Sequence, residues 1–184
     1  VILPTESLFT HDEHGFQTSF YTDPSGYQST LLPYLQSTNL LINGIYWDNR
    51  APSFFTQEEA HTLLKSTRLT TIADITCDIA PVASIPLTIR PSIIGDAVYG
   101  VDPQSLVELP PYSSNGLDIM AVDNLPNELP RDASMDFGAM FIENVLDAMM
   151  THDYPSQEMI KQATITQAGK LTPAYQYLTE YVNA

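Results

Sequence analysis

The sequence predicts an α/β fold in which helices cover a parallel sheet. Residues 38–47, TNLLINGIYW, form an apolar run of strand length, and residues 70–78, TTIADITCD, form a second. Between them, residues 56–66 have a helical pattern that starts with the capping-box spacing of Thr56 and Glu59. A strand, a helix and a strand in so short a segment form a βαβ unit, which makes the two strands parallel. Because both runs are apolar on both faces, helices are expected on both sides of the sheet.

Further strands are expected on either side of this unit. Residues 16–21 and 94–102 have the composition of short strands, and residues 117–126 form an apolar strand that a proline ends. Residues 79–116 are otherwise rich in loop-forming residues, so few regular elements are expected there.

The carboxyl-terminal third is expected to be helical. The longest helix is predicted over residues 130–150, where apolar residues recur at three- and four-residue spacing and acids gather near the start. Residues 154–184 are expected to carry one short helix, a turn at Gly169 and a final helix from Pro173.

Composition narrows the classes of function. The chain has 184 residues, enough for one domain or parts of two, and its net charge of −15 argues against nucleic acid or an anionic membrane as partner. The single cysteine, Cys77, excludes an intrachain disulfide. With no apolar run of about 20 residues and no recognisable signal peptide, a cytoplasmic protein is expected. A start at Val1 without methionine suggests a processed or truncated part of a longer protein.

Two aspartates stand at the exit of the second strand. In open α/β sheets, ligands bind at the carboxyl ends of strands, and Asp74, Thr76 and Asp78 lie on one face by alternation. Asp78 is well placed to orient a cationic substrate nitrogen or a nicotinamide ribose. It is equally suited to cap a loop or helix by accepting backbone N–H bonds, and the sequence leaves both roles open. For Asp74 the sequence favours a structural role.

Other candidate chemistry is weaker. Residues 11–14, HDEH, have metal-ligand side chains but no further ligands at a recognisable spacing, so no metal site is expected. Cys77 has no evident base beside it, which favours packing over nucleophilic chemistry. The chain contains neither G-x-G-x-x-G nor G-x-x-x-x-G-K-[ST], so the usual phosphate-cradling turn is missing.

Three segments resemble a known family in their order and spacing. They are LLINGIYWDNRAPSFFT (40–56), IADITCDIAPVASIP (72–86) and LDIMAVDNLPNELPRDASMDFGAMFIENVL (117–146). They are similar to the carboxyl-terminal part of the saccharopine dehydrogenase and lysine–2-oxoglutarate reductase family, within the alanine dehydrogenase and transhydrogenase superfamily. The stretch VDNLPNELPRDAS is the most specific, because no general packing demand dictates it. The form DNLP, with Leu125 rather than methionine after the asparagine, favours the saccharopine branch.

The resemblance implies a partial Rossmann-like parallel sheet with flanking helices, followed by carboxyl-terminal helices that return to an amino-terminal domain absent here. Residues 1–116 would be the second half of a nucleotide-binding domain, and residues 117–184 the returning segment. The implied reaction joins a lysine amine and 2-oxoglutarate as an imine, which a hydride from NAD or NADP reduces to a secondary amine. The partners would be an amino acid, a 2-oxo acid and the amino-terminal half on the same or another chain.

The resemblance also implies roles for individual residues. Asp74 and Asp78 match two aspartates of the family pattern, and Asp78 would be catalytic, beside the nicotinamide and the substrate. The remaining implied cofactor-binding residues are Ile45, Tyr46, Asn124, Leu125 and Pro126.

The chain departs from the family in two respects. Ile79, Ala80 and Pro81 stand where the family commonly has a polar or glycine pair, and the glycine-rich turn and the family's acid–base lysine and histidine are missing. This chain alone is therefore expected to be inactive and to bind a dinucleotide weakly. An alanine dehydrogenase-like oxidoreductase and a non-catalytic assembly domain remain the alternatives.

Overall fold

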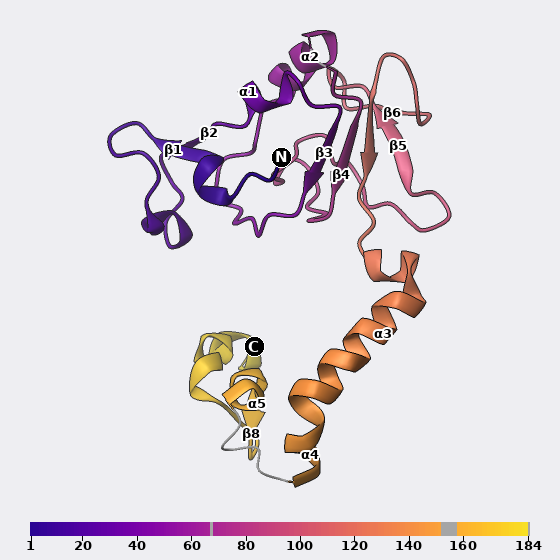
Figure 1. The fold of residues 1–184 in the computed structure, drawn as a ribbon. Coiled ribbons are helices and arrows are strands. Elements are labelled where there is room, and N and C mark those ends of the chain that lie inside the picture. The colour runs from indigo at the N-terminus through magenta and orange to yellow at the C-terminus, as the bar shows by residue number, and fades with distance from the viewer. Residues whose placement is uncertain (67, 152–157, 184) are drawn as a thin grey trace. The chain divides into compact units, whose positions relative to one another are not determined.

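The chain forms two compact units in a computed structural model that describes residues 1–66, 68–151 and 158–183. The first unit is Val1–Glu128 and the second is Leu129–Ala184 (Figure 1). The predicted division after residue 116 concerns the domains of a complete enzyme and stays a prediction. Within the described residues, no helix is long and apolar enough to cross a membrane.

The first unit is built on a five-stranded sheet with the strand order β3-β4-β7-β5-β6. The strands are β3 (Leu40–Asn43), β4 (Thr71–Asp74), β5 (Val98–Val101), β6 (Glu108–Leu109) and β7 (Leu117–Met120). Strands β3, β4 and β7 run parallel, whereas β5 pairs antiparallel with β6 and β7. The sheet is mixed because short loops without a crossover helix connect β5, β6 and β7. The predicted α/β class and the parallel pair are confirmed.

The crossover between β3 and β4 contains helix α2 (Gln57–Ser66), as predicted. The capping box is present in both directions. The Thr56 amide donates to Glu59 Oε2 at 2.7 Å, and the Glu59 amide donates to Thr56 Oγ1 at 3.1 Å. Two amides at the start of the helix are thereby paired, which fixes where the helix begins.

The two faces of β3 differ in exposure. Alternation puts Leu40 and Ile42 on one face, where they are 51% and 62% exposed, and places Asn43 on the other face, where it is buried. The buried core includes Ile72 of β4 and Ala60 of α2. The expectation that both faces of the sheet are covered is therefore wrong at β3, which is an end strand among the described residues.

The amino-terminal part forms a separate two-stranded antiparallel sheet of β1 (Phe9–His11) and β2 (Tyr27–Ser29), followed by helix α1 (Leu32–Leu35). The strand predicted over residues 16–21 is wrong, because Thr18–Tyr21 forms a 3-10 helix. Phe20 explains the difference, since its buried ring stacks on Phe9 at 4.7 Å. Tertiary packing of one aromatic ring outweighs the local β preference. The first 3-10 turn is Thr5–Ser7.

The second unit begins with the predicted long helix. It comprises α3 (Pro130–Phe141), a π-helical turn (Ile142–Leu146) and α4 (Asp147–Thr151), which confirms the prediction over residues 130–150. The remaining elements are α5 (Glu158–Ala163), β8 (Thr166–Gln167), β9 (Lys170–Leu171), a 3-10 helix (Pro173–Leu178) and α6 (Thr179–Val182).

The predicted turn at Gly169 connects β8 and β9. Gly169 has a φ of +74°, a backbone conformation that glycine adopts without steric cost. The helix predicted from Pro173 is present and starts as a 3-10 helix. Residues 154–157 and 184 of the predicted tail lie outside the described residues.

Candidate functional site

Three parallel strands end at the same edge of the sheet, and polar residues follow each of them. Asn43 closes β3, Asp74 closes β4 with Asp78 four residues further on, and Asn124 follows β7. Because β3, β4 and β7 are neighbours in parallel register, their carboxyl ends lie side by side. The structure therefore brings the three segments that the sequence singled out to one edge.

Asp74 is the centre of a buried hydrogen-bond network at this edge. Its carboxylate has no exposed surface. Oδ1 accepts from Asn43 Nδ2 at 2.9 Å and from Thr76 Oγ1 at 2.7 Å, and Oδ2 accepts from Thr88 Oγ1 at 2.6 Å. A buried carboxylate with donors from three segments is the arrangement that low-dielectric surroundings require. This arrangement leaves Asp74 no surface for a ligand.

Asn43 extends the network to the loop after β4. It is the register partner of Asp74, and its Nδ2 also donates to Ser84 Oγ at 2.9 Å. Sequence reasoning missed Asn43, Ser84 and Thr88, because the partners lie 14 to 41 positions apart. The available signal in the sequence was Asn43 itself, a polar residue at the end of an apolar strand. From that position its side chain reaches Asp74, the last residue of the neighbouring strand.

Cys77 joins the exits of β4 and β7. Its φ of +55° is unusual for a residue with a side chain, and its Sγ–H donates to the carbonyl oxygen of Ala121 at 3.1 Å. Burial raises the pKa of the Cys77 thiol, and the nearby carboxylates of Asp123, Asp74 and Asp78 raise it further. The thiol stays protonated and packs against the core, as the sequence predicted.

Asp78 lies half-buried just beyond this network. Partial burial raises the pKa of its carboxyl group, a hydrogen bond from Thr76 opposes that shift, and the charge of Asp74 adds to it. Among the hydrogen bonds of the described residues, none joins the Asp78 carboxylate to a backbone amide. A cap would make such a bond. The functional role of Asp78 stays a prediction.

The raised pKa gives a stability prediction for Asp78→Asn. Folding disfavours the ionised form of Asp78. The stability that this carboxyl group contributes in the wild type is therefore fully present below its pKa in the unfolded chain, near 3.8, and it is lost as the pH rises through the raised pKa of the folded state. The variant is therefore expected to melt at the same temperature as wild type or higher at neutral pH. Thermal melts from acid to neutral pH test this. A variant that melts well below wild type at neutral pH would show that the ionised carboxylate stabilises the fold.

The other predicted site residues lie at the same edge with different exposure. Tyr46 is 96% exposed, Ile45 and Leu125 are half-buried, and Asn124 and Pro126 are exposed. Leu125 starts a 3-10 helix, Leu125–Glu128, after β7. Each is accessible to a ligand, and their binding roles stay predictions.

The histidines of residues 11–14 stack on each other rather than converging on a common point. The rings of His11 and His14 are 4.1 Å apart and nearly parallel. Across the described ranges, no group of three or more histidine, cysteine or acidic side chains has an arrangement that would hold a metal ion.

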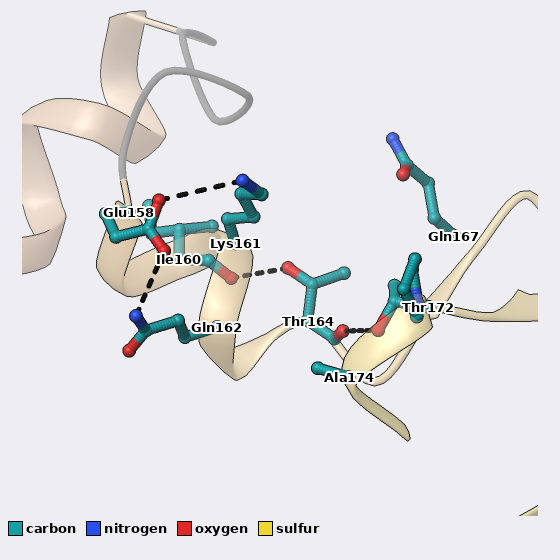
Figure 2. Close-up of a pocket in the computed structure, with 9 residues that line it drawn as sticks. Glu158, Ile160, Lys161, Gln162, Thr164, Gln167, Thr172 and Ala174 are labelled. Carbon is teal, nitrogen blue, oxygen red and sulfur yellow. Dashed lines mark hydrogen bonds and ion pairs between the residues drawn. The ribbon is translucent and has the colours of Figure 1, made fainter. Parts of the chain in front are cut away.

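A cavity of about 610 Å³ lies in the second unit, and none of the predicted site residues lines it (Figure 2). The carboxylate of Glu158, which lines this cavity, forms an ion pair with Lys161 Nζ at 3.7 Å and accepts a hydrogen bond from Gln162 Nε2 at 3.0 Å. Its carboxylate oxygens are thus already paired. The polar and acidic side chains described above lie at the carboxyl ends of β3, β4 and β7, and we regard this edge of the sheet as the candidate site.

Comparison with known proteins identifies homologues. The chain is 29% identical over 170 residues to "Alpha-aminoadipic semialdehyde synthase" of Arabidopsis thaliana, which covers 88% of this chain and 15% of that protein. It is 28% identical over 201 residues to "Alpha-aminoadipic semialdehyde synthase, mitochondrial" of Mus musculus, which covers 97% of this chain and 21% of that protein. The Rattus norvegicus protein of the same name is 29% identical over 175 residues. No protein-family model matches the chain.

These homologues confirm the resemblance seen in the sequence, with the chain corresponding to a portion of a longer protein. The chain spans about a fifth or less of the length of these relatives, 15% to 21%. The cytoplasmic location expected from the sequence stays a prediction.

Proposed function

We propose that this chain, whose homologues are alpha-aminoadipic semialdehyde synthases, is part of an NAD(P)-dependent oxidoreductase that forms or oxidises a secondary amine between an amino acid and a 2-oxo acid. The observation that carries the proposal is the placement of Asp78. It is a half-buried acid with a raised pKa where three parallel strands end, in the segment that matches the family's second aspartate.

The residues at the strand exits fit one side of a nicotinamide site. Ile45 and Tyr46 follow β3 and offer apolar surface, and Asn124, which follows β7, supplies an amide. The chain has no glycine-rich turn for the phosphates, so this side alone would hold the dinucleotide weakly. When bound, NAD(P)H supplies the hydride.

Asp78 has the properties that the amine chemistry needs. A carboxylate attracts a protonated amine or an iminium nitrogen, and partial burial strengthens that attraction by lowering the local dielectric. Because its pKa is raised, the carboxyl group also holds a proton at a pH closer to neutrality than an ordinary aspartate does. Asp78 therefore orients the reacting nitrogen and moves protons to and from it, while Asp74 fixes the loop on which Asp78 stands.

The free edge of β3 supports a partner segment. The carbonyl oxygens of Asn39 and Asn43 accept hydrogen bonds from the β4 side. By alternation, the backbone groups of Leu40 and Ile42 face the opposite edge, where the described residues place no strand. An amino-terminal half, on the same or another chain, would complete the sheet there and supply the missing phosphate-binding turn.

The activity of the complete polypeptide tests the proposal and separates its alternatives. We expect oxidation of NADH or NADPH that requires lysine and 2-oxoglutarate together. Oxidation supported by ammonium and pyruvate in their place would favour an alanine dehydrogenase-like enzyme. If no amine and oxo-acid pair supports oxidation although the protein is folded, the chain is an assembly domain and the proposal fails.

The isolated chain should bind the dinucleotide poorly. Without the glycine-rich turn, calorimetric titration of the 184-residue chain with NADH or NADPH is expected to give a Kd weaker than about 1 mM, or about −4 kcal/mol. Addition of the amino-terminal half should tighten binding. A micromolar Kd for the isolated chain would show that the missing turn is not needed for binding.

A further inference from the structure

We infer that Thr76 is a positioning residue of the Asp78 site, because its one hydroxyl proton lies between the carboxylates of Asp74 and Asp78, and the direction in which that hydroxyl points decides whether Asp78 is free to accept from a ligand. Thr76 stands midway between Asp74 and Asp78 on the chain segment that leaves β4. The inference rests on the proposed function only for the identity of the ligand, a cationic nitrogen.

Asp74 provides the fixed point of this arrangement. It is fully buried, and its Oδ2 is held by Thr88 Oγ1 at 2.6 Å while its Oδ1 is held by Asn43 Nδ2 at 2.9 Å. Donors from β3 and from the loop before β5 therefore fix the Asp74 carboxylate independently of Thr76. Removal of the Thr76 hydroxyl leaves two of its three hydrogen bonds in place.

Thr76 has one hydroxyl proton for two neighbouring carboxylates. Thr76 Oγ1 donates to Asp74 Oδ1 at 2.7 Å and accepts a long bond from the Asp78 amide at 3.5 Å. A hydroxyl group has one proton, so Thr76 donates to one carboxylate at a time: either to Asp74, in the hydrogen bond at 2.7 Å, or to Asp78, where its hydrogen bond lowers the pKa of that carboxyl group. While the proton is on the Asp74 side, the Asp78 carboxylate is free of it. The Asp78 carboxylate keeps its acceptor capacity for a ligand, while its backbone is held to the same hydroxyl.

Loss of the Asp74 charge and loss of the Thr76 hydroxyl should shift the pKa of Asp78 in opposite directions. Without the charge of Asp74, one cause of the raised pKa of Asp78 disappears, and the Thr76 hydroxyl is free to turn toward the Asp78 carboxylate. Without the Thr76 hydroxyl, the influence that lowers the pKa of Asp78 is lost and the charge of Asp74 remains. Besides Asp74 and Asp78, one more charged group, Asp123 after β7, acts on the adjacent Cys77 thiol.

Titration of the Asp78 side chain in this chain tests the inference. Carbon-13 NMR of the aspartate carboxyl groups, assigned with Asp78→Asn, gives the titration midpoint without cofactor or substrate. Thr76→Val is expected to raise the midpoint and Asp74→Asn to lower it, each by roughly half a pH unit or more. Thr76→Ser keeps the hydroxyl and should leave the midpoint close to that of wild type.

Thr88→Val is the matched control. It removes a hydroxyl of the same kind from the other Asp74 oxygen. It should weaken the fold while moving the Asp78 midpoint less than Thr76→Val does. Equal movement by Thr76→Val and Thr88→Val, or a shift of the same sign in Thr76→Val and Asp74→Asn, would overturn the inference. If Thr76→Val and Thr76→Ala both fail to fold although Thr88→Val folds, Thr76 is structural and the inference fails.

The complete enzyme separates this inference from the proposed function. If the Asp78 midpoints shift as expected but no lysine-dependent oxidation is found, Thr76 positions Asp78 for a different ligand and only the oxidoreductase proposal fails. If the enzyme is active, Thr76→Val should raise KM for the amine by about tenfold and change kcat less, because Asp78 keeps its carboxyl group while the hydroxyl that orients it is lost.

Discussion

Asp78→Asn in the complete enzyme is expected to lower kcat by about 10² to 10⁴, the usual contribution of a positioned acid or base. The amide is isosteric with the carboxyl group but cannot exchange a proton with the amine or attract its charge. The half-buried position and raised pKa of Asp78 mean that the fold gains nothing from its ionised form, so activity is lost without a loss of stability. Steady-state kinetics and thermal melts on the same preparation measure the two effects.

Asp12→Asn is the matched control for that variant. Asp12 is an exposed carboxylate beside the separate two-stranded sheet, where it accepts from Gln28 Nε2 at 3.2 Å. Its replacement should change neither kcat nor melting temperature. If Asp78→Asn melts early and its folded fraction is fully active, Asp78 is only a structural cap.

Asp74→Asn is expected to show the opposite balance, with a loss of about 2–4 kcal/mol in the free energy of unfolding of the first unit. The neutral amide is a weaker acceptor than the carboxylate. Its NH₂ group would also face a donor, either the Thr88 hydroxyl or the Asn43 amide and Thr76 hydroxyl, so hydrogen bonds to that position would be lost. Because Asp74 has no exposed surface, water cannot replace the lost bonds. Urea unfolding followed by circular dichroism measures the difference.

Thr88→Val sets the scale for the Asp74 result. It removes one of the three hydrogen bonds and should cost about 1–2 kcal/mol, less than the loss of the carboxylate that all three share. Should Asp74→Asn unfold at the same urea concentration as wild type, the buried network does not stabilise the fold, and Asp74 would have no claim to a structural role.

Local patterns in the sequence predicted much of the fold. The capping box at Thr56, the parallel strands around α2, the long helix over residues 130–150 and the turn at Gly169 all depend on nearby residues. The predicted strand over residues 16–21 failed because the burial of Phe20 against Phe9 depends on the tertiary fold. Strands β3 and β4 are also shorter than the apolar runs, since each ends at a buried polar residue, Asn43 or Asp74.

The candidate site was predictable in position but not in detail. The strand pattern placed Asp78 just beyond the carboxyl end of a parallel strand, and in the structure the carboxyl ends of the three parallel strands lie side by side. The donors to Asp74 were not predictable, because Asn43 and Thr88 reach it from 31 positions before and 14 positions after. Pairings at such separations depend on register and loop path, which periodicity does not contain.

Transfer of deuterium from a labelled nicotinamide tests the central claim most directly. The complete polypeptide would be incubated with lysine, 2-oxoglutarate and NADH or NADPH deuterated at the transferable position, and the product analysed by mass spectrometry. The proposed function predicts a secondary-amine product that carries one deuterium per molecule, and the loss of that product in Asp78→Asn. A product without deuterium, or labelled product formed by Asp78→Asn at the wild-type rate, would contradict the proposed role of the strand-exit site.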